Sequence, residues 1–364
     1  MNNDLSQQLQ QQVEQAHVKS NALRIVGSNS KAFYGNINTT LATAETLSLS
    51  EHEGVINYEP TELVITARAG TRLADIEKLL AENGQMLAFE PPAFSDHATI
   101  GGTIACNLSG PRRAYAGAAR DFLLGCKLLN GRGEILHFGG EVMKNVAGYD
   151  VSRLMAGAMG TLGILLEVSL KVLPIDELVS TQVFECTPDD ALAKIHQWAQ
   201  TPLPVSASSY HDSHLHIRLS GASKAVQAAV QSIGGEPQKH NIYWQRLKEQ
   251  QLSFFNDAHS LWRLSLASDT TSSLLANNDQ DNILLEWGGA LRWLKTENAD
   301  ESTASKIRND ITRLDGHATL FRSTDNTIQR FHPLSAGLQR VHSNIKKAFD
   351  PNNILNPGLY YADL

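Results

Sequence analysis

Short apolar runs separated by turn residues fill the first half of the chain and predict β-strands. They cover 22–27, 63–69, 122–129 and 162–173. Leucine and isoleucine recur at helical spacing from Thr71, and the Asn83-Gly84 pair predicts the end of that helix. The turn Asn-Gly-Arg-Gly at 130–133 predicts a hairpin between 123–130 and 134–138. Strands mixed with short helices, without a regular βαβ alternation, indicate an α+β fold.

The pattern changes near Pro174, where glycine becomes rarer and helices alternate with pairs of strands. The predicted elements are strand 178–186, helix 188–200, strands 204–210 and 213–219, and helix 221–232. A second series follows, with strand 260–267, a helix or loop, strands 282–286 and 290–295, helix 300–313 and strand 317–322. Each series approximates the β-α-β-β-α-β order of the ferredoxin-like motif. A helix is predicted over 335–348, and the segment FDPNNILNPGLY follows it at 349–360.

The composition is that of a folded globular protein, because 42% of the 364 residues are hydrophobic and 19% are charged. A net charge of −7 argues against nucleic-acid binding, which requires a basic surface. The N-terminal segment predicts a polar helix with Leu5, Leu9 and Val13 on one side and lacks the features of a secretory signal. No apolar run reaches the roughly 18 residues of a membrane span. Three cysteines without a CxxC pair predict no disulfide framework, no metal site and no iron–sulfur cluster in this chain, and a reduced, cytoplasmic setting.

Three glycine-rich stretches are candidates for binding a ligand through the backbone. RIVGSNSK at 24–31 forms either a nest of N–H groups for an anion or an ordinary strand–loop junction. TIGGT at 99–103 either lets a phosphate or flat ring approach the backbone or forms a helix packed tightly on a sheet. GAMGTLGIL at 157–165 is typical of a turn into a strand. Neither GxxxxGK[ST] nor a GxGxxG turn between strand and helix occurs, so a phosphate-bearing ligand requires another glycine-based architecture.

Four motifs in a fixed order resemble the FAD-linked oxidases with a PCMH-type flavin domain, the vanillyl-alcohol-oxidase superfamily. They are GSNS at 27–30, ATIGGTIACNLSGP at 98–111, KNVAGYDVSRLMAGAMGTLGIL at 144–165 and FDPNNILNPG at 349–358. The match is carried by residues 20–175 and 345–360. Within the superfamily, the short chain, KNVAGYDVSRL and the LWRLSL, GGALRWL and ATLFR series resemble the FAD-binding E subunits of glycolate oxidase.

The resemblance implies an α+β protein with three parts. Residues 1–175 would form the PCMH-type FAD-binding fold with its two subdomains. Residues 176–334 would form an α+β cap domain of ferredoxin-like design, with one such unit or two. Residues 335–364 would return and pack on the FAD-binding domain.

The resemblance also implies FAD and a set of residues that contact it. In this family the diphosphate lies between the first glycine loop and the TIGG segment. The implied contacts, by position, are Gly27, Ser28, Asn29, Ser30, Thr99, Gly101, Gly102, Ala105, Asn107, Gly110, Tyr115, Asp121, Gly163, Ile164 and Asn356. Many relatives tether the flavin to a histidine in the first loop, but GSNSK contains neither histidine nor cysteine. We therefore expect non-covalent FAD, with Cys106 as a small core residue.

Oxidation of a 2-hydroxy acid requires a group that takes the hydroxyl proton, a cation that holds the carboxylate, and a flavin that accepts the hydride. Arg263, Arg292 and Arg322 lie in predicted cap strands and either clamp a carboxylate or point outward to acidic partners. His317 is the best single candidate for the base, although a histidine in a turn is common. His214 and His216 share a strand face. This spacing favours an exposed polar surface over two ligands of a metal site. The catalytic residues are otherwise unassigned.

The resemblance implies the FAD-binding subunit of a multi-subunit glycolate dehydrogenase that oxidises glycolate to glyoxylate. A second flavin subunit would carry the fuller catalytic set, and an iron–sulfur subunit would pass electrons toward quinone. The chain would then be cytoplasmic and peripheral to the inner membrane through its partners. Two alternatives stay open: a non-catalytic or electron-relay subunit that serves assembly, and a free-standing FAD-dependent oxidase of another hydroxy acid.

Overall fold

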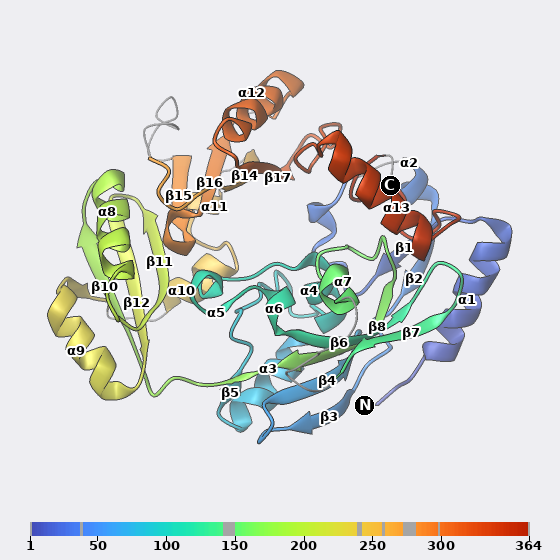
Figure 1. Ribbon diagram of the computed structural model, residues 1–364, viewed down its shortest axis with the longest axis horizontal. Helices are drawn as coiled ribbons and strands as arrows, with labels where there is room; N and C mark the ends of the chain where they lie inside the picture. The colour runs from blue at the N-terminus through green and yellow to red at the C-terminus, as the bar shows by residue number, and fades with distance from the viewer. Residues whose placement is uncertain are drawn as a thin grey trace. The chain divides into compact units, whose positions relative to one another are not determined.

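The computed structural model divides the chain into two compact units (Figure 1). It describes residues 2–36, 39–140, 150–238, 242–256, 259–271, 282–297 and 299–362. The first unit comprises Met1–Ser109, Ala118–Ile175 and Pro333–Leu364, and the second comprises Gly110–Gly117 and Asp176–His332. The short piece Gly110–Gly117, expected in the first domain, therefore clusters with the second unit. The motif residues 144–149 lie outside the described residues.

Two sheets form the framework of the first unit. The larger sheet is antiparallel, with the order β3 (Val55–Glu59), β4 (Val64–Arg68), β8 (Ile164–Lys171), β6 (Leu123–Leu129) and β7 (Ile135–Gly139). The smaller sheet pairs β1 (Leu23–Val26) with β2 (Glu45–Ser48) in parallel. A short pair joins β5 (Gln85–Met86) to β9 (Leu173–Pro174). The predicted hairpin is confirmed, because β6 and β7 pair antiparallel on either side of the turn at 130–134.

Helices precede, connect and follow the strands of the first unit. They are α1 (Ser6–Lys19), η1 (Ala32–Tyr34), α2 (Thr39–Thr43), α3 (Leu73–Glu82), α4 (Ile100–Cys106), α6 (Ala119–Phe122), α7 (Val151–Met155) and α13 (Ala336–Phe349). The predicted helix after Thr71 is α3, which buries Leu73, Ile76 and Leu80 as its spacing requires. The predicted N-terminal helix is α1, which buries Leu9 and Val13.

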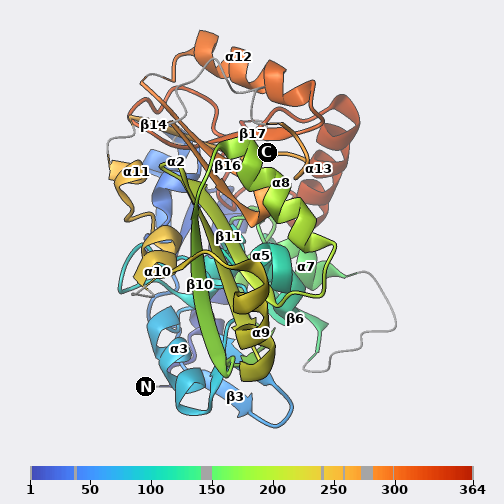
Figure 2. The ribbon, with the colours of Figure 1, turned by 90° about the vertical axis from the view of Figure 1, so that its left-hand side faces the viewer.

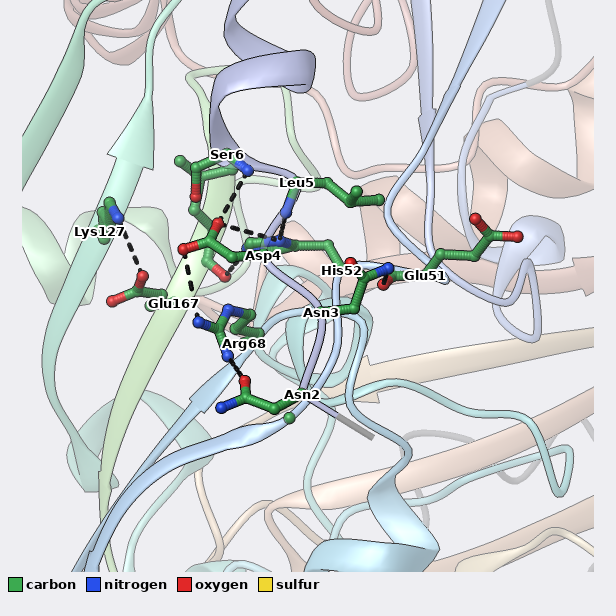
Figure 3. Close-up of polar contacts among 12 residues, drawn as sticks. Asn2, Asn3, Asp4, Leu5, Ser6, Glu51, His52, Arg68, Lys127 and Glu167 are labelled. Atoms are coloured by element: carbon green, nitrogen blue, oxygen red, sulfur yellow. Dashed lines mark hydrogen bonds and ion pairs between the residues drawn. The ribbon is translucent and has the colours of Figure 1, made fainter.

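A polar network ties the start of α1 to the larger sheet (Figure 3). His52 is fully buried; its Nδ1 accepts from the Leu5 amide at 3.0 Å, and its Nε2 donates to the Leu166 carbonyl at 3.0 Å. Burial lowers the pKa of His52, which keeps the ring neutral and able to accept and donate. Asp4 pairs with Arg68 of β4 at 3.4 Å. The N-terminus is therefore fastened by buried hydrogen bonds rather than by apolar packing alone.

The second unit contains one eight-stranded antiparallel sheet. Its strands are β10 (Leu178–Glu185), β11 (Val205–His211), β12 (His214–Gly221), β13 (Glu236–Pro237), β14 (Ser260–Ser265), β15 (Ile283–Glu286), β16 (Leu291–Thr296) and β17 (His317–Ser323). The spatial order is β13-β10-β12-β11-β15-β16-β14-β17. The first half is β10–β13, in which β10 lies between β12 and β13. The second half is β14–β17, in which β14 lies between β16 and β17. The two halves are joined where β11 pairs with β15. The sheet thus consists of two fused ferredoxin-like units.

Helices cover one face of this sheet. α8 (Pro188–Ala199) and α9 (Ser223–Ile233) pack on the first half (Figure 2), and α12 (Glu301–Thr312) packs on the second. The predicted helix or loop between β14 and β15 falls largely on 272–281, outside the described residues. The short helices α10 (Ile242–Lys248) and α11 (Ser253–Asn256), which we did not predict, also belong to this unit. No helix in the described ranges is long and apolar enough to cross a membrane.

The C-terminal segment belongs to the first unit and is fixed there by a buried ion pair. Figure 1 shows this red segment reaching the blue strand β1, where Leu355 bridges to Leu23. Lys346 Nζ lies 2.7 Å from Asp350 Oδ2, and both side chains are buried. The ammonium group also donates to the Thr161 and Leu355 carbonyls at 2.7 and 2.9 Å. The ion pair therefore has hydrogen-bond partners at Thr161 and in the segment 354–355, and a buried pair requires such partners.

We expect Lys346→Met to lower the free energy of unfolding by about 3–5 kcal/mol, because Asp350 would be left buried without its counter-charge. Urea titration followed by circular dichroism measures this change. The neighbouring exposed lysine provides the matched control: Lys347→Met should change stability by less than about 0.5 kcal/mol. Equal effects of the two substitutions would contradict the role of the buried pair.

Candidate functional site

A cleft in the first unit brings the first two glycine-rich stretches together. Its volume is about 380 Å³, and a smaller cavity of about 80 Å³ shares part of its wall. Predicted residues in the larger lining are Gly27, Ser28, Asn29, Ser30, Thr99, Gly102, Ala105 and Asn356. Predicted residues that the smaller cavity adds are Gly101, Gly163 and Ile164. The structure therefore gathers eleven of the fifteen predicted contacts around two cavities that share part of their lining.

The first wall is the turn that follows β1. Gly27 sits so close to Thr99 that an added Cβ would lie 2.4 Å from the Thr99 hydroxyl, so only glycine fits there. Asn29 adopts a left-handed φ of 64°, which curls the loop. Within the described part of the chain, no hydrogen bond uses the backbone N–H of Ser28, Asn29 or Ser30. Consecutive N–H donors of this kind in the wall of a cleft are suited to an anion.

The second wall is α4, whose two glycines have different roles. A Cβ on Gly101 would lie 2.5 Å from Ala69 Cβ and 2.8 Å from the Ala69 carbonyl oxygen, so Gly101 allows the helix to pack on the backbone directly after β4. A Cβ on Gly102 would meet only the Thr99 hydroxyl, at 3.2 Å, and otherwise open space. The sequence left two interpretations of TIGGT open, a backbone that a ligand can approach and a helix packed tightly on a sheet. Each of them applies to one of the two glycines. Gly102 leaves room in the cleft, whereas Gly101 serves packing.

The third glycine-rich stretch and Asn356 close the cleft on its remaining side. The Met159 amide donates to the Ala105 carbonyl at 2.9 Å, which fixes the turn against the end of α4. The Asn356 side chain is buried; it accepts from the Ile25 amide and donates to the Met159 carbonyl, both at 2.8 Å. Asn356 therefore uses its amide group to hold two walls together.

The charge of the lining is positive. Arg24 and Lys31 line the cleft, and no aspartate or glutamate does so among the described residues. Lys31 is 8% exposed, and its Nζ donates to the Ala93 carbonyl at 3.2 Å. We did not assign either cation from the sequence. The position of Lys31, directly after the loop of small residues, was the only available signal.

Asn107 and Asp121 stabilise the chain next to the cleft rather than lining it. Asn107 ends α4 in a left-handed conformation, and its Oδ1 accepts from the Arg120 amide at 3.0 Å. Asp121 accepts from the Ala118 amide at 2.9 Å. Both side chains therefore form local caps.

Gly110 and Tyr115 belong to the second unit and are held there. The Trp287 indole donates to the Gly110 carbonyl at 3.0 Å, and the Tyr115 hydroxyl donates to Ser208 Oγ at 3.0 Å. The Arg113 guanidinium lies 4.3 Å from the centre of the Trp287 ring. Arg113 therefore stacks on an aromatic ring within the second unit.

The three cap arginines do not share one environment. Arg292 pairs with Leu264 and Leu285 on the helix-covered face and is fully buried. Its Nε donates to the Gly289 carbonyl at 3.2 Å, and its terminal nitrogens donate to the Thr270 and Thr271 carbonyls. Arg292 therefore neither clamps a carboxylate nor points outward to acidic partners. The strand register turns its side chain toward the helices, where backbone carbonyl oxygens accept its hydrogen bonds. Burial lowers the pKa of Arg292 to about 10.

Arg263 and Arg322 lie on the opposite face of the sheet. The Arg263 guanidinium lies 5.1 Å from the centre of the Trp287 ring, and Arg263 is half-buried. Arg322 pairs with Leu261, which shares a face with Arg263, and burial lowers the pKa of Arg322. Arg263 and Arg322 therefore lie on the face opposite Arg292, and the Arg322 guanidinium lies 5.8 Å from the centre of the Phe321 ring.

The candidate histidines show no metal-binding arrangement. His317 is exposed, and its ring centre lies 5.1 Å from that of His332. His216 stacks on Tyr243 at 3.9 Å, whereas His214 is exposed at the start of β12. No group of three or more potential ligands gathers among the described residues. His317 is thus the accessible imidazole of the set.

Comparisons with known proteins agree with this geometry. Residues 5–139 match the family model of a FAD binding domain. The chain is 47% identical over 361 residues, 99% of each chain, to the glycolate oxidase subunit GlcE of Escherichia coli (strain K12). It is 34% identical over 128 residues to the glycolate oxidase subunit GlcD of Bacillus subtilis (strain 168), covering 35% of this chain and 26% of that one. A solved structure of alkyldihydroxyacetonephosphate synthase shares the fold, with a TM-score of 0.69 at 16% identity over 96% of this chain and 74% of that chain.

The two α4 glycines should respond differently to alanine. We expect Gly101→Ala to lower the free energy of unfolding by on the order of 1–3 kcal/mol, because the new methyl group collides with Ala69. Gly102→Ala should leave stability unchanged or raise it by up to about 1 kcal/mol through helix propensity. Urea titration of the unliganded chain compares them. If Gly102→Ala lowers the free energy of unfolding more than Gly101→Ala does, our assignment of the two positions is wrong.

Proposed function

The chain belongs to the family of the glycolate oxidase subunit GlcE, and we propose that it is the FAD-binding subunit of a multi-subunit glycolate dehydrogenase. It would bind FAD in the cleft of the first unit and contribute to the oxidation of glycolate to glyoxylate. A second flavin subunit and an iron–sulfur subunit would complete the assembly, which would associate with the membrane through those partners.

The cleft carries this proposal because its lining fits a flavin nucleotide. The diphosphate of FAD is anionic and accepts hydrogen bonds, and the loop offers N–H groups at Ser28, Asn29 and Ser30 that no bond among the described residues uses. Gly102 leaves open space beside them. Two lining cations and no lining carboxylate, among the described residues, favour an anion. FAD, when bound, supplies the hydride acceptor that the side chains of the protein lack.

We propose that the cofactor is held without a covalent bond. The loop Gly27–Lys31 has no histidine or cysteine that could form a tether. Cys106 lines the cleft, but burial raises the pKa of its thiol to about 11. Since the thiolate is the nucleophilic form, Cys106 stays unreactive near neutral pH.

The carboxylate of a 2-hydroxy acid would be held by Arg263 and Arg322. Both lie on the sheet face opposite α12, and guanidinium groups pair bidentately with carboxylates. Arg292 is excluded from this role by its burial and its bonds to backbone carbonyls. The group that takes the hydroxyl proton is not assigned, and His317 is a candidate only through its exposure.

Electron relay without substrate oxidation is the second candidate. It is favoured by the burial of Arg292 away from the expected clamp, which leaves Arg263 and Arg322 on the other face. The buried carboxylate on that face, Glu286, already accepts a hydrogen bond from the Trp293 indole at 2.7 Å. The chain contains three cysteines, fewer than the four thiolates of a common iron–sulfur cluster, so a relay through such a cluster would require a partner.

Anaerobic addition of glycolate to the purified chain tests the catalytic proposal. We expect the flavin absorbance to bleach, and we expect Arg263→Ala to raise the glycolate concentration needed by about 10- to 100-fold without loss of flavin. Arg313→Ala, at the exposed arginine that directly follows α12, is the control and should change nothing. Flavin that stays oxidised with glycolate alone, but becomes reduced when the partner subunits are added, would instead identify a relay.

Gly102→Val tests the placement of the cofactor. The branched side chain would extend from α4 into the cleft, so we expect less than about one tenth of the wild-type flavin to be retained, while the far-ultraviolet circular dichroism spectrum is unchanged. If the variant folds and keeps a full complement of FAD, the cofactor does not lie along this segment.

A further inference from the structure

Lys31 places a positive charge inside the wall of the cleft. The residue follows directly after the loop Gly27–Ser30, lines the cleft and is 8% exposed. We propose that Lys31 balances a negative charge of the bound flavin nucleotide and so contributes directly to holding it. This inference rests on the proposed function of the cleft.

The side chain of Lys31 is held in position by groups outside the loop. Its Nζ donates to the Ala93 carbonyl at 3.2 Å and lies 5.8 Å from the centre of the Phe94 ring. Phe94 packs edge-on against Phe33 of η1, with ring centres 5.5 Å apart. The ammonium group is therefore positioned before a ligand arrives, and little side-chain freedom has to be lost on binding.

The surroundings of Lys31 favour an anion over a neutral ligand. Arg24 is the other cation of the lining, and no carboxylate belongs to it among the described residues. Charge interactions in a partly desolvated cleft are stronger than in water, because the effective dielectric constant is lower.

Two parts of FAD carry the charge that Lys31 could meet. The diphosphate is anionic in every redox state, and the isoalloxazine ring gains negative charge when it is reduced. Riboflavin has the ring but lacks the diphosphate. Binding of FAD and riboflavin, and the midpoint potential of bound FAD, therefore distinguish the two sources.

The test compares three full-length variants with the wild-type chain. Lys31→Met removes the charge and keeps the apolar stem, and Lys31→Arg keeps the charge. Lys78→Met, at an exposed position of α3, is the matched control. Thermal melting of each unliganded chain shows whether it folds. Fluorescence quenching then gives the affinities for FAD and riboflavin at low and high salt, and dye equilibration gives the potential of the bound flavin.

If Lys31 faces the diphosphate, we expect Lys31→Met to weaken FAD binding by on the order of 10- to 100-fold, with less salt dependence and unchanged riboflavin affinity. If Lys31 faces the ring, oxidised FAD should bind nearly as before, while its midpoint potential becomes more negative. In both cases Lys31→Arg should keep most of the wild-type FAD affinity or midpoint potential. Lys78→Met should change neither.

The inference is overturned if folded Lys31→Met keeps both the FAD affinity and the potential of the wild-type chain. It is also overturned if FAD and riboflavin weaken equally at unchanged potential, because that result indicates a role in shape rather than charge. If the wild-type chain itself binds no FAD, the proposed function fails, and this outcome is distinct from a failure of Lys31 alone.

Discussion

The ion pair between Lys346 and Asp350 is the interaction on which the cleft depends. It anchors the C-terminal segment by joining α13 to the carbonyls of Thr161 and Leu355. Once this segment is fixed, Asn356 can bridge β1 and the turn at Met159. These bonds connect residues more than 180 positions apart, so the cleft exists only after the two ends of the first unit have met. A ligand that contacts both walls would stabilise that closure.

Two properties of the walls select what can enter the cleft. Glycine at 27 lets the loop approach Thr99, and glycine at 102 keeps the helix surface bare. The lining also excludes negative side chains, within the described residues, while it includes Arg24 and Lys31. Shape and charge thus favour the same class of ligand, an elongated anion lying along the backbone. A FAD-binding role for a GlcE-family chain is consistent with both properties.

Local pattern predicted most of the fold. The spacing of α3, the turn between β6 and β7 and the alternation of strands and helices after Pro174 are each encoded locally, and the described residues contain the strands of both series. The short helices α10 and α11 were missed because four to seven residues carry little periodicity. The placement of Gly110–Gly117 with the second unit was also missed, since it depends on the hydrogen bonds of Tyr115 to Ser208 and of Trp287 to the Gly110 carbonyl.

The site was only partly predictable, for the same reason. The glycine motifs located the cleft, but the separate roles of Gly101 and Gly102 depend on Ala69, more than thirty positions away. The orientation of Arg292 depends on the register of β16 with β14 and β15. The burial of Lys31 depends on Ala93 and Phe94, which nothing near the loop could indicate.

The absorbance spectrum of the purified chain, recorded before and after acid precipitation, tests the central claim most directly. The account predicts a yellow protein with about one FAD per chain, all of it released into the supernatant by acid. A preparation that is colourless and stays so when FAD and its companion subunits are supplied would contradict the account, and flavin that stays in the pellet would contradict non-covalent binding.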